Sequence, residues 1–360
     1  MLSSRSLRPT LAAAASLVLL CACGGPPEPA DQRIVILGFD GMDPVLAQRW
    51  MDAGKLPNFK RLAQSGHFQP LGTSNPPQSP VAWSNFATGD HPGEHGIFDF
   101  LRRNPETYGP QFSISENIPP ESHLELFGLS IPLDEGQVLN RRRGRPFWSD
   151  AEQAGARASV LRVPVTYPPD PIHRMLSGMG VPDLLGTQGT YTFYTTTRMD
   201  QAGSSTRVVR VRPGRDGTIE TALEGPPDPL RQQAEPMQVP LVIEPAGPGA
   251  RVRLGDTETT LQPGEWSDWV RLKFDVTGPV NVTGTVRVLL VQDYPRPRLY
   301  VSPIQIDPMA PAVPISSPPK YAAELAERIG MYHTIGMPEE TWSLNEEHIS
   351  DAAWLEMEKT

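Results

Sequence analysis

Two side chains in this sequence are candidates for catalysis or metal binding, and the first is Ser79. Ser79 precedes Pro80, and the short apolar run that begins there ends at Gly89. This order predicts a helix with Ser79 at the N-cap, Pro80 at the first helical position and Gly89 just past the end. A hydroxyl there lies beside unpaired N–H groups and the positive end of the helix dipole, which together hold phosphate and favour the ionised hydroxyl. A plain capping role is the alternative for such a serine taken alone.

The second side chain is Asp40, which closes an apolar run. Residues 33–39 read Arg-Ile-Val-Ile-Leu-Gly-Phe, and Asp40 and Gly41 follow directly. A continuous apolar run bounded by turn residues is typical of a strand buried on both faces of a parallel sheet. Asp40 is then expected at the carboxyl end of the strand, where open α/β sheets bind ligands. A carboxylate there and a hydroxyl at a nearby helix end could share one metal ion.

Short helices are expected between these two side chains. Asp43 and Pro44 predict the start of a helix that stops at Gly54, and residues 56–65 predict a second helix closed by Gly66. A loop would then lead to Ser79.

We interpret the histidines and arginines that follow this helix as structural rather than catalytic residues. Pro92 and Gly93 rule out a regular helix between His91 and His95, so a shared metal is not expected; we expect packing and hydrogen bonding for His95 and exposure for His91. The basic cluster formed by residues 141–143 and Arg145 is interpreted as a solvated turn rather than a phosphate clamp.

Four short motifs follow one another in the first third of the sequence: Ile36-Leu37-Gly38-Phe39-Asp40-Gly41, Leu56-Pro57-Asn58-Phe59, Ser79 through Thr88-Gly89, and His95-Gly96-Ile97. Together they resemble the type I phosphodiesterase and nucleotide pyrophosphatase family of the alkaline phosphatase superfamily. The match is specific over residues 33–100 and looser over residues 158–194 and 332–360.

The resemblance implies roles for both side chains. In that family the first aspartate binds metal, and the nucleophile is a Thr or Ser at a fixed spacing before the Thr-Gly pair; counting back nine residues from Thr88 gives Ser79. The resemblance thus implies Asp40 and Ser79 as metal ligands, Ser79 as nucleophile through a phosphoseryl intermediate, and a phosphate ester as substrate. It also implies two divalent metal ions, with zinc expected and manganese as the alternative.

The sequence also departs from the family. Phe100 stands where the nucleotide pyrophosphatase branch carries an Asn that helps hold phosphoryl oxygens, so a nucleotide substrate is less secure. A sulfatase is disfavoured because Pro80 follows Ser79 directly and Trp83 stands in place of the Arg that sulfatases need. The Asp-His-Gly and the Asp and His separated by three residues that supply further metal ligands in the family do not occur in the sequence.

Two functions follow from that departure. The first is a metal-dependent phosphoesterase represented here by a C-terminally truncated and impaired chain. The second is a non-catalytic envelope lipoprotein that keeps the fold as a binding or scaffold module.

The N-terminus is interpreted as a lipoprotein signal. Residues 1–23 carry Arg5, Arg8 and the apolar run 11–20 without an acid, which is typical of a secretion leader rather than a membrane span. Residues 20–23 resemble the bacterial lipobox, so Cys23 is expected to carry lipid, with Cys21 as a rival site. An ordinary secretory leader is the alternative, and residues 24–31 are interpreted as a tether. The expected location is the bacterial cell envelope, lipid-anchored to the outer membrane or the periplasmic face.

The net negative charge of the chain limits the classes of partner that it is expected to bind. The formal charge is −9, and loss of Arg5 and Arg8 with the leader lowers it by two to −11. An acidic chain has no general field that attracts nucleic acid or anionic lipid, so we expect no nucleic-acid partner, and contact with the membrane through the N-terminal lipid alone.

The expected fold class is α/β: an alkaline-phosphatase-like, mostly parallel sheet flanked by helices, with an antiparallel β-rich insertion. Period-two alternation from about residue 206 predicts the insertion. We expect the first part of the core in residues 32–200, the β-rich insertion in 201–306, and a return to an incomplete core in 307–360. Asp183 follows a predicted strand and is a candidate for the lining of the substrate cleft.

Overall fold

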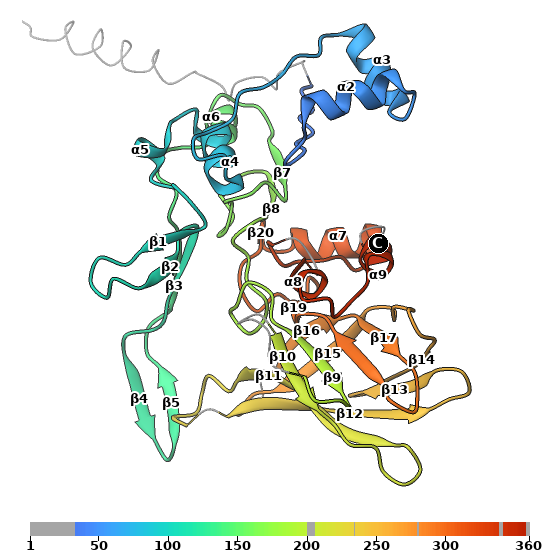
Figure 1. Ribbon diagram of the computed structural model, residues 1–360. Helices are drawn as coiled ribbons and strands as arrows, with labels where there is room; N and C mark the ends of the chain where they lie inside the picture. Colours follow the sequence, from blue (N-terminus) through green and yellow to red (C-terminus); the bar gives the residue numbers. More distant parts are fainter. Residues whose placement is uncertain (1–32, 200–205, 234, 279–280, 338–340, 358–360) are drawn as a thin grey trace, which may run out of the picture.

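The computed structural model describes residues 33–199, 206–233, 235–278, 281–337 and 341–357 (Figure 1). The expected leader and tether, together with Cys23, lie outside these residues. Helices α2 to α6 gather at one end of the molecule, a β-rich body forms the other end, and α7, α8 and α9 lie between them (Figure 1). In chain order the helices are α2 (Pro44–Asp52), α3 (Pro57–Ser65), α4 (Ser79–Thr88), α5 (Pro92–His95), α6 (Phe147–Gln153), α7 (Tyr321–Ile329), α8 (Thr341–Asn345) and α9 (Asp351–Met357).

The predicted capping residues mark the start of α2 and the end of α4. Asp43 caps α2, and its Oδ1 accepts hydrogen bonds from the backbone N–H groups of Val45 and Leu46 at 2.7 and 2.8 Å. Gly89 ends α4 in the left-handed conformation at φ 75°, which a side chain would disfavour. The helices expected at 44–54 and 56–65 are therefore confirmed.

Three antiparallel ladders form an arm that runs from the helices toward the β-rich body (Figure 1). They pair β1 (Leu101–Arg103) with β2 (Pro110–Phe112), β3 (Ser115–Ile118) with β6 (Gln137–Asn140), and β4 (His123–Leu126) with β5 (Leu129–Pro132). A small sheet next to them has the order β20-β8-β7, from Ser316–Ser317, Arg174–Leu176 and Ser159–Leu161. In this sheet β7 and β8 are parallel.

The β-rich body contains three sheets. The first has the order β10-β9-β18-β17, from Thr206–Arg210, Tyr191–Thr195, Arg298–Val301 and Val288–Gln292. The second has the order β11-β12-β13-β14, from Ile219–Pro227, Pro236–Pro245, Ala250–Leu254 and Thr257–Leu261. The third has the order β15-β16-β19, from Val270–Asp275, Asn281–Val286 and Gln305–Ile306.

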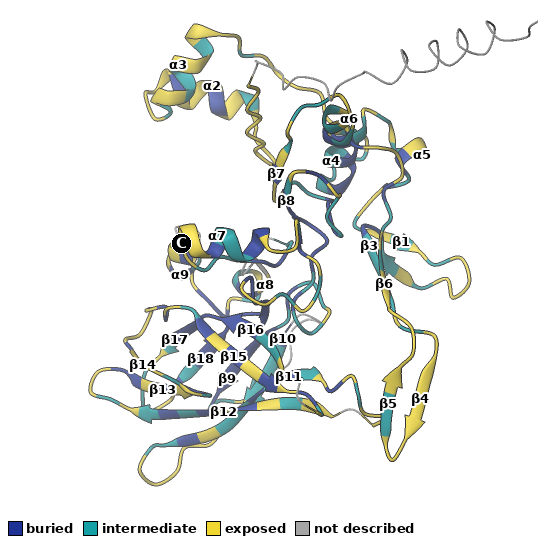
Figure 2. Ribbon diagram, turned by 180° about the vertical axis from the view of Figure 1, so that it is seen from behind, coloured by how far each residue is buried: buried dark blue, intermediate teal, exposed yellow. Residues whose placement is uncertain are grey.

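The main hydrophobic core fills the β-rich body. Val252 and Leu254 of β13 and Leu272 and Phe274 of β15 are buried, whereas the residues between them are exposed. This alternation confirms the period of two expected from the sequence, and Figure 2 shows the buried residues concentrated in the body. The domain limits stay predictions; β9, which precedes the expected limit at residue 200, lies in one sheet with β10, β17 and β18.

The mixed α/β class is confirmed, but the mostly parallel sheet is not. Among the described strands, only β7–β8 and β9–β10 pair in parallel. The strand expected at residues 33–39 is wrong: these residues form no ladder, and Ile34 and Val35 are about four-fifths exposed. An apolar run forms a buried strand only when neighbouring strands and helices cover it, and the described residues leave this run uncovered.

Candidate active site

One close backbone approach brings the two predicted motifs together. A Cβ atom added to Gly38 would lie 2.3 Å from Cη2 of the Trp83 side chain, so Gly38 packs directly on the indole. Trp83 belongs to α4, which begins at Ser79, and Gly38 lies two residues before Asp40. A side chain at position 38 would therefore force either the Trp83 indole or the Asp40 turn to shift.

Ser79 is the first residue of α4 and is partly exposed. The N-cap is Gln78, one residue before the predicted position, so the assignment of Ser79 as the N-cap is corrected. No described residue hydrogen-bonds to the Ser79 hydroxyl, which leaves the oxygen chemically available.

The N-terminus of α4 has fewer free donors than expected. The backbone N–H groups of Val81 and Ala82 both donate to the Gln78 carbonyl, at 3.0 and 2.9 Å, and Pro80 has no N–H group. An anion at this helix end would therefore depend mainly on the Ser79 N–H and on the helix dipole.

Asp40 is exposed in the turn that precedes α2. In the part of the chain that the structure describes, no group of three or more His, Cys, Asp or Glu side chains is arranged to hold a metal ion. Asp40 and Ser79 are fewer ligands than the three or four protein ligands of a typical zinc site. The described residues alone thus do not fit a metal centre.

His95 is buried behind α4 and fixes the end of that helix. Its Nε2 lies 2.7 Å from Oδ1 of Asn85, and the backbone N–H of Ile97 donates to its Nδ1 at 3.1 Å. Nδ1 is therefore the acceptor, and Nε2 carries the proton of a neutral ring. Burial lowers the pKa of His95, partly offset by Asp90, while Arg142 lowers it further. Packing of His95 and exposure of His91 are both confirmed.

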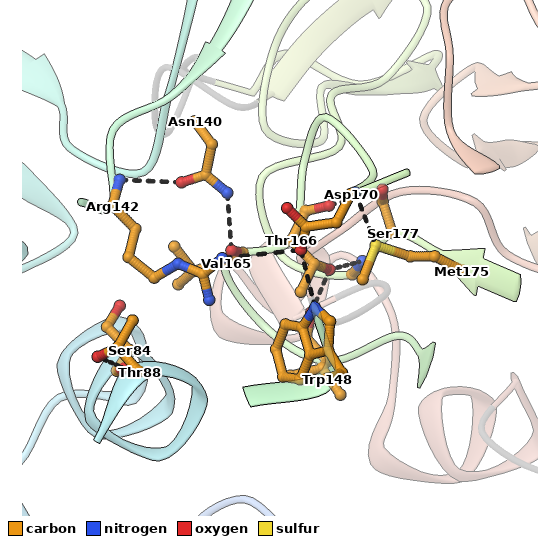
Figure 3. A network of polar contacts seen from close by, with 12 residues as sticks. Ser84, Thr88, Asn140, Arg142, Trp148, Val165, Thr166, Asp170, Met175 and Ser177 are labelled. Atoms are coloured by element: carbon orange, nitrogen blue, oxygen red, sulfur yellow. Dashed lines mark hydrogen bonds and ion pairs between the residues drawn. The ribbon is translucent and has the colours of Figure 1, made fainter. Parts of the chain in front are cut away.

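Arg142 corrects the solvated turn expected for the basic cluster. Its side chain is 3% exposed, its guanidinium lies over the Trp148 ring at 5.6 Å, and its Nη2 is 3.8 Å from Oδ2 of Asp170. Nε and Nη1 of Arg142 are buried without a hydrogen-bond partner among the described residues. Figure 3 shows this side chain between α4, which carries Ser84 and Thr88, and the loop that carries Asp170. Sequence reasoning missed it because a run of arginines does not indicate which one is buried.

A polar network holds the loops behind Arg142 (Figure 3). Trp148 Nε1 donates to Asp170 Oδ2 at 2.9 Å, and Asn140 Nδ2 donates to the Val165 carbonyl at 2.9 Å. The Ser177 hydroxyl donates to the Thr166 carbonyl at 2.8 Å. The loops are thereby fixed to β6 and α6, and α4 packs on this scaffold.

Asp183 is buried in its own loop. It accepts hydrogen bonds from the backbone N–H groups of Thr187 and Thr190, both at 2.8 Å, and from the Thr187 hydroxyl at 2.5 Å. These contacts organise the loop that leads into β9, and its expected position in a substrate cleft stays a prediction. Phe100 packs against the cluster of Ile114, Val165 and Met179, as suits an apolar side chain.

The described chain is thus an α/β protein in which Gly38, two residues before the exposed Asp40, packs on the helix that begins with Ser79. A sequence model of the type I phosphodiesterase / nucleotide pyrophosphatase family matches residues 34–223, and the chain belongs to this family. Searches of curated proteins and of solved structures found no match. No helix in the described residues is both long and apolar enough to cross a membrane.

Proposed function

We propose that this chain is a metal-dependent phosphoesterase in which Ser79 is the nucleophile. The observation that carries the proposal is the contact of Gly38 with Trp83, because it joins the Asp40 turn to the helix that begins at Ser79. The partly exposed hydroxyl of Ser79, which has no protein partner among the described residues, supports the same role.

The proposed reaction has two steps. The Ser79 oxygen forms a bond to phosphorus and loses its proton to water, while the bond from phosphorus to the leaving oxygen breaks. Water then attacks the phosphorus of the phosphoseryl intermediate, and the bond to the Ser79 oxygen breaks as that oxygen takes up a proton from water. A monoester substrate releases phosphate in this step, and a diester substrate releases a phosphomonoester. The dipole of α4 favours both the ionised hydroxyl and the phosphoryl group beside it.

The family generally uses divalent metal ions, and we propose Asp40 and Ser79 as two of the ligands, with zinc as the expected metal and manganese as the alternative. Such ions lower the pKa of the attacking group and neutralise phosphoryl charge. Because the described residues supply only these two ligands, no step of the reaction is assigned to the metal.

We also propose that lipid on Cys23 anchors the chain to the bacterial cell envelope. The acidic charge, −9 for the full sequence and −11 without Arg5 and Arg8, fits a substrate that is bound locally rather than attracted by a general field. A phosphate ester is the proposed substrate class.

The test is hydrolysis of 4-nitrophenyl phosphate and of its bis-ester, with and without zinc or manganese, by the full chain with Cys21→Ser and Cys23→Ser. We expect metal-dependent turnover that Ser79→Ala lowers by about 10³-fold or more, and that Ser79→Thr retains in part because a hydroxyl remains. A Ser74→Ala variant is the matched control in the preceding loop. Absence of turnover and of bound metal would contradict the proposal and favour the non-catalytic scaffold.

A further inference from the structure

A polar cavity lies in the β-rich body. It has a volume of about 520 Å³ and is lined by β9 and β10 of one sheet and by β11 and β12 of the next (Figure 1). Small-molecule sites occupy cavities of roughly 300–1,000 Å³, so this cavity has the size for a ligand. The reaction proposed for Ser79 does not use it.

Two contacts between the sheets fix the walls of the cavity. The Tyr194 hydroxyl of β9 donates to the Ala222 carbonyl of β11 at 2.8 Å, and Nη1 of Arg207 in β10 lies 2.9 Å from Oε2 of Glu224 in β11. Burial raises the pKa of Tyr194, so its phenol keeps the donated proton at neutral pH. The walls are thus held together by the protein itself, which lowers the cost of ordering them around a ligand.

Thr192 brings to the cavity a polar group that the protein leaves unused. Thr192 is 6% exposed and lines the cavity, beside Arg207 in the register of β9 and β10. Its hydroxyl has no hydrogen-bond partner among the described residues. A hydroxyl that is more than nine-tenths buried is costly to leave unpaired, so this oxygen is suited to a ligand that enters the cavity.

The charges of the lining disfavour an anion. Arg207 is the cation of the lining, and its ion pair with Glu224 neutralises it. Glu220 adds a second carboxylate, which leaves the lining with an excess of negative charge. A phosphate or a nucleotide would be repelled by this charge and would find no free cation among the lining residues.

The rest of the lining is uncharged. The hydroxyl of Thr221 and the amide of Gln238 both donate and accept hydrogen bonds, as does the hydroxyl of Thr192. Val209 and Ala222 add apolar surface. A sugar matches this mixture, because its hydroxyl groups donate and accept while the C–H groups of its ring are apolar.

We propose that this cavity binds a neutral sugar, a mono- or disaccharide unit, with the Thr192 hydroxyl as a direct hydrogen-bond partner. A peptide strand added to β11 is a poorer occupant, since the carbonyls of Ala222 and Glu224 already lie against the donors of Tyr194 and Arg207, at 2.8 and 3.5 Å. The proposal is independent of the catalytic role of Ser79.

The first test is binding of the full chain with Cys21→Ser and Cys23→Ser to an array of neutral, sulfated and phosphorylated glycans. A metal chelator in the buffer prevents binding through a metal ion at Asp40 and Ser79. We expect binding to neutral glycans. Binding to none of them, or to sulfated or phosphorylated glycans alone, would overturn the proposal.

The second test assigns the site to the Thr192 hydroxyl. The strongest neutral glycan of the array is titrated as the free sugar, and Thr192→Val should raise its dissociation constant about tenfold through the loss of one hydrogen bond. Thr192→Ser keeps a hydroxyl and should stay near the parent value. Thr260→Val, at an exposed position of β14, is the matched control and should change nothing. An unchanged dissociation constant in Thr192→Val would overturn the proposal.

Unfolding in urea separates a binding role of Thr192 from a structural one. Because its hydroxyl has no protein partner among the described residues, and because the buried Val301 faces it in β18, valine should be accepted at this position. The urea midpoint of Thr192→Val without sugar should therefore be no lower than that of the parent chain. A lower midpoint would show that the hydroxyl serves the fold and would contradict the proposed role.

Discussion

The Ser79 hydroxyl is available because it is not used to cap α4 and has no hydrogen-bond partner among the described residues. Gln78 takes the N-cap position, and the carbonyl of Gln78 accepts the first hydrogen bonds of α4. The hydroxyl is partly exposed at the positive end of the helix, where negative charge is favoured. At the residue scale, then, the sequence predicted the right helix and placed its cap one residue late.

His95 gives a prediction about pH. Burial lowers its pKa below the ordinary value of 6.5, so the unfolded chain takes up a proton before the folded chain does. The free energy of unfolding should therefore be unaffected by His95 above pH 6.5 or so and should fall as the pH drops below that value. Urea unfolding at a series of pH values measures it.

The matched variant is His95→Gln, which can still donate to Asn85 but does not titrate. It should flatten the fall in stability on the acid side, whereas His91→Gln, at an exposed site, should not. Identical pH profiles for the parent chain and His95→Gln would contradict the assigned neutral ring.

At the scale of helices and loops, α4 brings the Ser79 region next to the segment that ends at Asp40. The sequence predicts the helices of this part of the site but not the contacts between them. The caps at Asp43 and Gly89 were readable because they depend on neighbouring residues alone. The contact of Gly38 with Trp83 and the burial of Arg142 were not, since each depends on residues distant in the chain. The prediction of a strand at residues 33–39 is wrong for the same reason. An apolar pattern predicts that a segment is buried, but the strands and helices that would cover it are distant in the chain and cannot be read from the pattern.

The Gly38 contact leads to a prediction at this scale. Gly38→Ala places a Cβ atom 2.3 Å from Trp83 and should lower phosphoesterase activity by about tenfold or more, because the clash shifts the Asp40 turn relative to α4 or displaces the Trp83 indole between them. Trp83→Phe removes the atoms that clash, so Gly38→Ala with Trp83→Phe should recover part of the loss. Steady-state rates on the bis-ester measure both.

Gly72→Ala is the control for that pair, because no atom lies within 4 Å of a Cβ at position 72. An unchanged rate in Gly38→Ala would show that the two segments are not coupled in the working enzyme.

At the scale of the whole molecule, the largest cluster of buried apolar side chains lies in the β-rich body, away from Ser79. Alternating residues of β15 make this testable: Leu272 is buried in the main core, whereas Lys273 points outward. Leu272→Ala should lower the free energy of unfolding by about 2–5 kcal/mol, and Lys273→Ala by no more than about 0.5 kcal/mol. Denaturant unfolding measures both values, and similar losses at the two positions would contradict the assigned faces of the strand.

The central claim is that Ser79 carries the phosphoryl group. Its most direct test is rapid acid quenching during turnover of 4-nitrophenyl phosphate, followed by mass spectrometry of the peptide that contains Ser79. The account predicts a phosphoryl group on Ser79 in the parent chain and on Thr in Ser79→Thr, with none in Ser79→Ala. Turnover that persists in Ser79→Ala, or a phosphoryl group on another residue, would contradict it.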